Sequence, residues 1–174
     1  MNPARKLALV LPAVWGCACA PALDWREVRA GDSGVSALFP CRPSVQTRIV
    51  RLVNSSVPLT LHVCTAGGVS WAVASADLVD PALVGPALIE LVASAKANLV
   101  GRSLERSPFS VNGGTPNADA VRELVAGKLP DGQVVREHVG VFARATWAVQ
   151  ITALGVAPSP EAVATFFESV HVRP

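Results

Sequence analysis

The chain has 174 residues, 51% of them hydrophobic, and a formal net charge of +2. This length predicts one domain with a sizeable core. Arg5 and Lys6 precede all thirteen acidic residues, so residues 23–174 carry 13 − 13 = 0 net charge, and a neutral chain without a basic run argues against nucleic acid as a main partner.

Residues 1–22 resemble an export signal. The charged pair Arg5-Lys6 is followed by an apolar run, Leu7 to Trp15, which is too short to span a bilayer. Ala20-Pro21-Ala22 fits the small-x-small pattern of a signal peptidase site, and cleavage there would release Leu23. The sequence therefore predicts an exported protein with a single domain over residues 23–174.

A second processing route stays open. Val14-Trp15-Gly16-Cys17 resembles a bacterial lipoprotein box, although Trp15 stands where a small residue is usual. On that route Cys17 carries a lipid, and the protein is an outer-membrane lipoprotein. An uncleaved membrane anchor is the third alternative. Each places the protein in the periplasm or cell envelope, with the membrane reached only through the signal or a lipid anchor.

The first half of the domain alternates polar and apolar residues, as strands do. Turn residues such as Asn54-Ser55-Ser56 and Gly67-Gly68 separate the runs. The predicted strands cover residues 23–28, 35–39, 46–53, 59–64 and 69–78. They form consecutive hairpins.

A helix is predicted from Asp80-Pro81 to about Leu99, with Gly101 as its terminator. Asp80 is a good cap and Pro81 a good first residue. Pro86 conflicts with an unbroken helix, so the regular helix could instead begin at Gly85-Pro86 after a separate turn.

Strands are predicted to resume over residues 102–105 and 109–111, followed by a turn at 112–114. Residues 116–128 are ambiguous, because Val121, Leu124 and Val125 have helical spacing while their place in a meander favours a strand.

The last forty residues give the clearest pattern. Residues 135–142 and 147–153 alternate on either side of a short turn, which predicts a hairpin. Ser159-Pro160-Glu161 then has the chemistry of a helix start. Val163, Phe166, Phe167 and Val170 share one face of that helix. We expect Phe166 and Phe167 to be buried against the sheet.

The predicted fold class is α+β: an antiparallel meander sheet with two main helices packed on it. Gly-Val-Ser-Ala-Leu-Phe-Pro at 34–40, the helix after Asp80-Pro81 and the closing Phe-Phe-Glu-Ser-Val at 166–170 are similar to small exported bacterial proteins of the Mog1/PsbP-like type. This resemblance covers residues 25–172 and implies a central antiparallel sheet between helices and a scaffolding or binding role. Of its best-known relatives, one binds a small GTPase and another supports a photosynthetic complex, but the chain has no matching interaction residues.

Cleavage after Ala22 leaves two of the four cysteines, Cys41 and Cys64, in an oxidising compartment. One strand with its turn separates their segments, so the two can lie side by side. We expect a disulfide that closes a loop of about 22 residues and is worth roughly 3 kcal/mol. Two buried thiols are the alternative. The chain has no CxxC pair and no metal-ligand spacing, and nothing points to a cofactor.

Residues that could carry chemistry are sparse. His62, His138 and His171 lie on separate elements, and no Gly-x-Ser-x-Gly motif is present. The basic residues of the strands form a candidate anion-binding face, with a solvated sheet face that discourages aggregation as the alternative reading. They are Arg48, Arg51, Arg136 and Arg144.

The function expected is a non-catalytic binding or assembly-support role for an exported bacterial envelope protein, with an envelope protein as partner. A small-molecule carrier and a periplasmic enzyme of unrecognised type are the alternatives. A cleft in which a histidine and a carboxylate converge would favour the enzyme, and a flat exposed apolar patch would favour partner binding.

Overall fold

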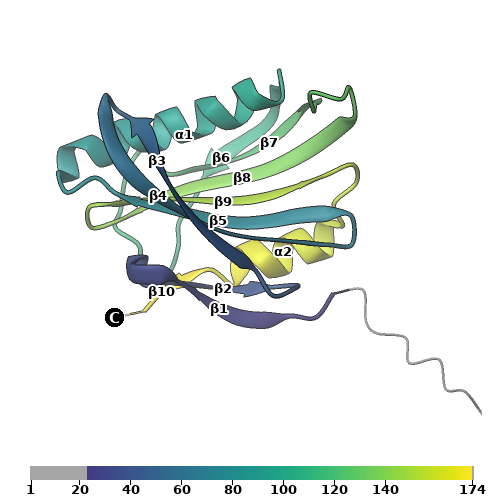
Figure 1. Ribbon diagram of the computed structural model, residues 1–174, viewed down its shortest axis with the longest axis horizontal. Coiled ribbons are helices and arrows are strands. Elements are labelled where there is room, and N and C mark those ends of the chain that lie inside the picture. Colours follow the sequence, from purple (N-terminus) through teal and green to yellow (C-terminus); the bar gives the residue numbers. More distant parts are fainter. Residues whose placement is uncertain (1–22, 174) are drawn as a thin grey trace, which may run out of the picture.

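The computed structural model describes residues 23–173, so the predicted signal and Cys17 lie outside the described residues. Strands make up 52% of this part of the chain and helices 20%. They form two antiparallel sheets (Figure 1). The large sheet has seven strands in the order β3-β4-β5-β9-β8-β7-β6, and the small sheet has three in the order β1-β2-β10.

The strands are longer than predicted in most cases. Those of the small sheet are β1 (Arg26–Ala30), β2 (Val35–Phe39) and β10 (His171–Val172). Those of the large sheet are β3 (Ser44–Leu52), β4 (Ser55–Ala66), β5 (Val69–Asp77), β6 (Arg102–Pro108), β7 (Val121–Lys128), β8 (Val134–Arg144) and β9 (Trp147–Gly155).

The predicted fold class, one meander sheet with two main helices, is wrong. The protein is mostly β, and its first two strands leave the meander to build a second sheet. Pro40 and Pro43 explain this break, because neither has an N–H to carry a sheet ladder from β2 into β3. Both edges of β2 are then occupied, one by β1 and the other by β10.

One helix is long. A 3-10 turn, η2 (Pro81–Leu83), is capped by Asp80, whose carboxylate accepts from the N–H of Ala82 at 2.8 Å. The helix α1 (Val84–Asn98) follows, so the alternative with a separate turn before Pro86 is correct. Pro86 lies in the first turn of α1, where a missing N–H breaks no hydrogen bond.

The helix α2 (Pro160–Glu168) starts as predicted, with the Oγ of Ser159 accepting from the N–H of Ala162. Residues 116–128 resolve in favour of a strand, β7, over residues 121–128. Residues 109–111 belong to no strand, contrary to prediction. Another short 3-10 turn, η1 (Gly31–Ser33), joins β1 to β2.

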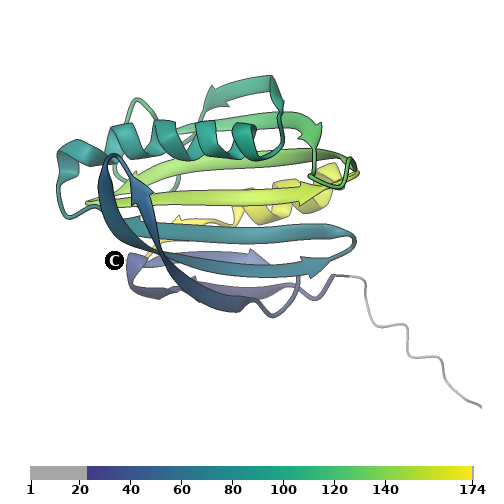
Figure 2. The same cartoon turned by 45° about the horizontal axis from the view of Figure 1, so that its top comes forward.

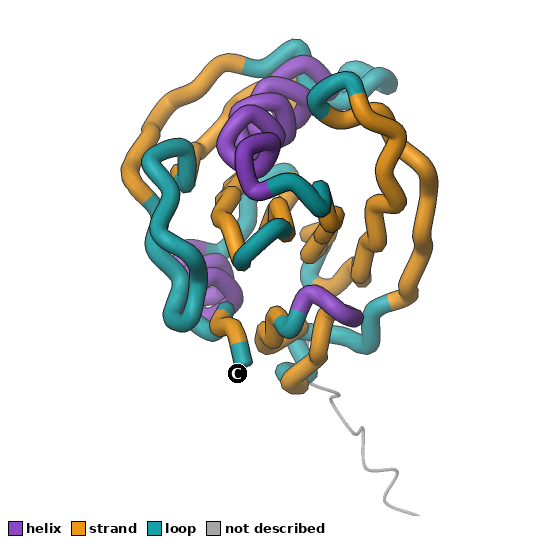
Figure 3. The backbone as a smooth tube through the Cα atoms, turned by 90° about the vertical axis from the view of Figure 1, so that its left-hand side faces the viewer, coloured by secondary structure: helices purple, strands orange, loops and turns teal. Residues whose placement is uncertain are grey.

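The two helices cover opposite faces of the large sheet (Figures 1 and 3). Ala95 and Leu99 of α1 pack on Val125, Val135 and Val139 of the adjacent strands β7 and β8. The opposite face meets α2 and the small sheet. The large sheet thus lies between α1 on one side and a mixed layer on the other.

The core between the two sheets is built on aromatic rings. Phe166 is fully buried and meets Phe39 of β2 and Trp71 of β5, with both pairs of ring centroids 5.3 Å apart. Phe167 is also buried, and Gly140 of β8 leaves room for its ring, because a Cβ there would lie 3.0 Å from it. The predicted burial of both phenylalanines is confirmed.

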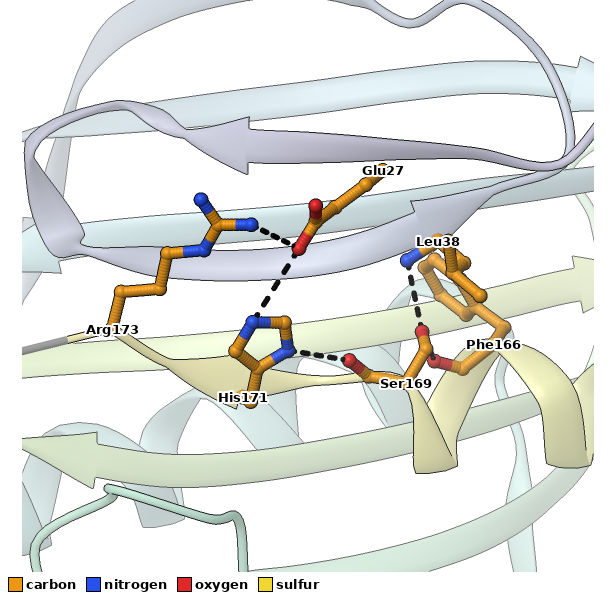
Figure 4. A network of polar contacts seen from close by, with 6 residues as sticks. All are labelled: Glu27, Leu38, Phe166, Ser169, His171 and Arg173. Atoms are coloured by element: carbon orange, nitrogen blue, oxygen red, sulfur yellow. Dashed lines mark hydrogen bonds and ion pairs between the residues drawn. The ribbon is translucent and has the colours of Figure 1, made fainter.

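Polar contacts join the end of α2 to the small sheet (Figure 4). Glu27 of β1 forms an ion pair with Arg173, and Nε2 of His171 on β10 lies 3.5 Å from the same carboxylate. Ser169 follows α2 directly and bonds to the backbone of β2. Residues near the two ends of the described chain are therefore held together.

Candidate binding site

The predicted disulfide is confirmed. Cys41 and Cys64 are bonded, with their Cα atoms 6.0 Å apart, which lies inside the range that a disulfide requires. The bond ties the Pro40–Pro43 segment to β4, and so fixes where β3 begins.

The predicted anion-binding face is not assembled. Arg48 and Arg51 lie on β3 but opposite Leu59 and Ser56, an odd spacing that puts the two on opposite faces. Arg136 lies on β8, with β4, β5 and β9 in between, roughly 19 Å away across the sheet. The prediction assumed neighbouring strands, but the β8–β9 hairpin joins the sheet through β9.

Arg144 is also apart from these residues. It ends β8 and directs its guanidinium at the turn before β2, since a Cβ on Gly34 would lie 3.2 Å from its Nη2. Gly34 has φ +71°, which side chains rarely adopt, so glycine suits this position both in conformation and in space.

The edge strand β3 is exposed along most of its length. It pairs with β4 over nine consecutive positions without a shift in register, and no other described strand pairs with it. Val45 and Ile49 project on one face and are 58% and 70% exposed. Figure 2 shows β3 and β4 bending away from the plane of the central strands.

The opposite edge of the large sheet differs. β6 contains a register shift between Ser103 and Glu105, ends at Pro108, and carries charges of both signs. Bulges, prolines and mixed charges discourage the addition of a further strand. β3 has neither a bulge nor a proline, and its two charged residues are both arginines.

A hollow of about 390 Å³ lies beside the start of β3, between β1 and β4. Three arginines, Arg26, Arg29 and Arg42, line it together with His62. Arg26 and Arg29 come from β1, Arg42 from the disulfide-bonded segment, and His62 from β4 opposite Val45. No local sequence pattern predicts this group, because β1 and β4 belong to different sheets.

His62 is almost fully enclosed. It is 5% exposed, and its Nδ1 is buried without a hydrogen-bond partner among the described residues. Burial lowers the pKa of His62, because a charged imidazole loses its hydration there. The ring is therefore neutral at neutral pH.

A second hollow, of about 320 Å³, contains His138 and Glu105 with Arg122. Burial lowers the pKa of His138, and the positive charge of Arg122 adds to this shift while Glu105 opposes it. The side chains of His138 and Glu105 make no hydrogen bond or ion pair in the part of the chain that the structure describes. They share a hollow without forming a hydrogen-bonded acid–base pair. The third histidine, His171, lies in the small sheet, where its Nε2 is 3.5 Å from the carboxylate of Glu27.

Two acids are buried under α1. Glu123 of β7 lies 3.4 Å from Lys96 of α1 and also pairs with Arg106 of β6. Burial raises the pKa of Glu137 on β8 to about 7, and Thr152 beside it opposes the shift. Glu137 therefore resists ionisation in the folded protein.

Within residues 23–173, no group of three or more His, Cys, Asp or Glu residues could hold a metal ion. None of the helices in that range is long and apolar enough to cross a membrane. The sequence matches no protein-family model, and a comparison with curated proteins gave no match. The resemblance to Mog1/PsbP-like proteins stays a prediction.

Proposed function

We propose that this protein is an exported, non-catalytic binding protein of the bacterial cell envelope, and that it holds an extended segment of an envelope partner on β3. The observation that carries the proposal is the regular, exposed edge of β3. Such an edge presents unpaired N–H and C=O groups along its length, and an added strand satisfies them.

The charges of β3 favour an acidic partner. Arg48 and Arg51 are its only charged residues, and Arg42 precedes it by two positions. A second copy of β3 laid along this edge would bring arginines together, which is unfavourable. An acidic strand with apolar residues facing Val45 and Ile49 would instead be complementary in charge and in burial.

Export is supported by the disulfide. Disulfides persist in oxidising compartments such as the periplasm and are rare in the cytosol. The Cys41–Cys64 bond, together with the signal-like residues 1–22, supports a protein that functions outside the cytoplasm.

The test is site-specific photo-crosslinking in intact cells. A benzophenone side chain at Thr47 of β3 is expected to crosslink a partner through an acidic, extended segment, identified by mass spectrometry of the crosslinked peptide. The same group at Ser103 of β6 serves as the comparison and should give no such product. Equal crosslinking from both edges would contradict the proposal.

A matched pair of variants sharpens the test. Ile49→Glu places an acid on the β3 edge and should abolish the Thr47 crosslink by repelling an acidic strand. Leu104→Glu makes the same change on β6, where Leu104 is 43% exposed, and should leave the crosslink intact. A crosslink that survives Ile49→Glu would show that β3 does not hold the partner.

A further inference from the structure

The hollow lined by Arg26, Arg29, Arg42 and His62 carries more positive charge than its surroundings neutralise. Arg26 pairs with Asp24. Glu27 also lines the hollow, but its carboxylate pairs with Arg173 and lies 3.5 Å from Nε2 of His171. Arg29 and Arg42 make no hydrogen bond or ion pair with any residue from 23 to 173. Two of the arginines that line this space therefore have no counter-charge from the described chain.

These two arginines come from separate elements that the fold brings together. Arg29 is on β1, one position before the end of that strand, and Arg42 sits between Cys41 and Pro43. The disulfide and the proline restrict the backbone on both sides of Arg42. A basic pair placed in this way is partly preorganised, so an anion that binds it orders less of the protein.

His62 supplies a second, independent feature of the same hollow. Leaving a buried polar atom without a partner is costly, so an unpaired imidazole nitrogen at this depth calls for an explanation. Because the ring is neutral, one nitrogen carries a proton and the other accepts. With Nδ1 as the protonated nitrogen, its N–H is the donor that lacks a partner, and a ligand oxygen can accept from it.

We propose that this hollow binds a phosphate group, with Arg29 and Arg42 as its charged contacts and His62 as a neutral donor. Guanidinium forks match the oxygens of a tetrahedral oxyanion and bind them in pairs. A phosphate dianion would neutralise both guanidinium charges. A carboxylate carries a single negative charge and would neutralise only one of them. The inference goes beyond the proposed function and involves no residue on which the β3 crosslinking test depends.

The probe for the test is inorganic phosphate, titrated calorimetrically into the full-length protein at low ionic strength. We expect one phosphate to bind per chain. Arg29→Gln and Arg42→Gln should each weaken binding about 10-fold or more, since each removes charge-assisted hydrogen bonds. Arg102→Gln removes an exposed arginine of β6 and should change nothing. Absence of binding, or equal loss with Arg102→Gln, would overturn the proposal.

The role of His62 needs a readout other than affinity, because its replacement could disturb the core. The ring nitrogen resonances of His62 should shift when phosphate is added to the wild-type protein, and those of His138 should not. A shift of both histidines alike, or of neither, would remove His62 from the site.

Free phosphate and a lipid headgroup share this chemistry, and vesicles separate the two sources. Sedimentation with phosphatidylglycerol vesicles that is lost in the Arg29→Gln/Arg42→Gln double variant, and displaced by phosphate, would assign the site to a phospholipid. Calorimetric phosphate binding without such sedimentation would assign it to a soluble phosphate compound. Vesicle binding that the double variant retains, without calorimetric phosphate binding, would overturn the site.

Discussion

The hydroxyl of Ser169 accepts a hydrogen bond from the backbone N–H of Leu38 at 2.9 Å, across 131 positions of sequence. The same hydroxyl donates to the carbonyl of Phe166 at 2.7 Å (Figure 4). One side chain thus closes the end of α2 and binds the N–H of Leu38, a position of β2 that lies beyond the first residue of β10. It links α2 to the small sheet, which lies on the same face of the large sheet.

Removal of this hydroxyl should loosen the contact between α2 and β2. We expect Ser169→Ala to lower the free energy of unfolding by about 1–2 kcal/mol, because it leaves the N–H of Leu38 without a partner. Urea unfolding of the variant measures the loss. Ser169→Thr keeps the hydroxyl and should retain more stability than the alanine variant; the reverse order would show that the hydrogen bond contributes little.

Phe166 is the centre of the aromatic core. Phe166→Ala should cost about 3–5 kcal/mol, because the ring is fully buried between Phe39 and Trp71 and its loss leaves a cavity. Phe166→Leu should cost less, since leucine refills part of that volume. Thermal unfolding of the alanine variant within error of the wild type would contradict this account of the core.

The disulfide should stabilise the fold by roughly 3 kcal/mol, given the sequence separation of 23 from Cys41 to Cys64. The double variant Cys41→Ser/Cys64→Ser should unfold at correspondingly lower urea concentration. Wild-type protein in reductant should approach the same value, while the double variant should not respond to reductant. Two alkylated thiols in exported protein under non-reducing conditions would remove the bond from the native state.

The free energy of unfolding should decrease as the pH rises, because of Glu137. Its pKa is about 7 in the folded protein against an ordinary value of 4.5, so the folded state binds this proton more tightly. Protonated Glu137 makes its full contribution to the free energy of unfolding below pH 4.5. This contribution, at most about 3 kcal/mol, is lost as the pH rises through about 7. Glu137→Gln should abolish that slope in urea unfolding, whereas Glu168→Gln, an exposed acid on α2, should keep it. An unchanged slope in Glu137→Gln would mean that another group titrates.

Export predicts a defined N-terminus. Mature protein should begin at Leu23, or at an acylated Cys17 if the lipoprotein route is used. N-terminal sequencing and intact mass of protein from the envelope fraction distinguish the two. Soluble mature protein that retains Met1 would refute both routes.

Elements that depend on local pattern could be predicted. The β8–β9 hairpin, the cap of α2 at Ser159 and the Cys41–Cys64 pair follow from neighbours in sequence. The separate sheet could not, because nothing local to β2 shows that His171 will pair with Ser36. The prediction of an anion-binding face was wrong for the same reason. Residue type alone does not show that Arg48 and Arg136 lie on distant strands, or that Arg29 and Arg42 line one hollow because β1 belongs to the small sheet.

The closure of the small sheet also sets an order of events in time. β10 pairs His171 with Ser36, so a strand near the start of the domain completes its pairing only with a segment 135 positions later. Contacts of such separation form late, because the cost of closing the intervening loop is paid first. When the N-terminal side emerges first from a ribosome or an export channel, the edge of β2 that pairs with β10 stays unpaired until the last residues emerge. The large sheet can assemble earlier, so we expect the small sheet to appear as the slow final phase of folding.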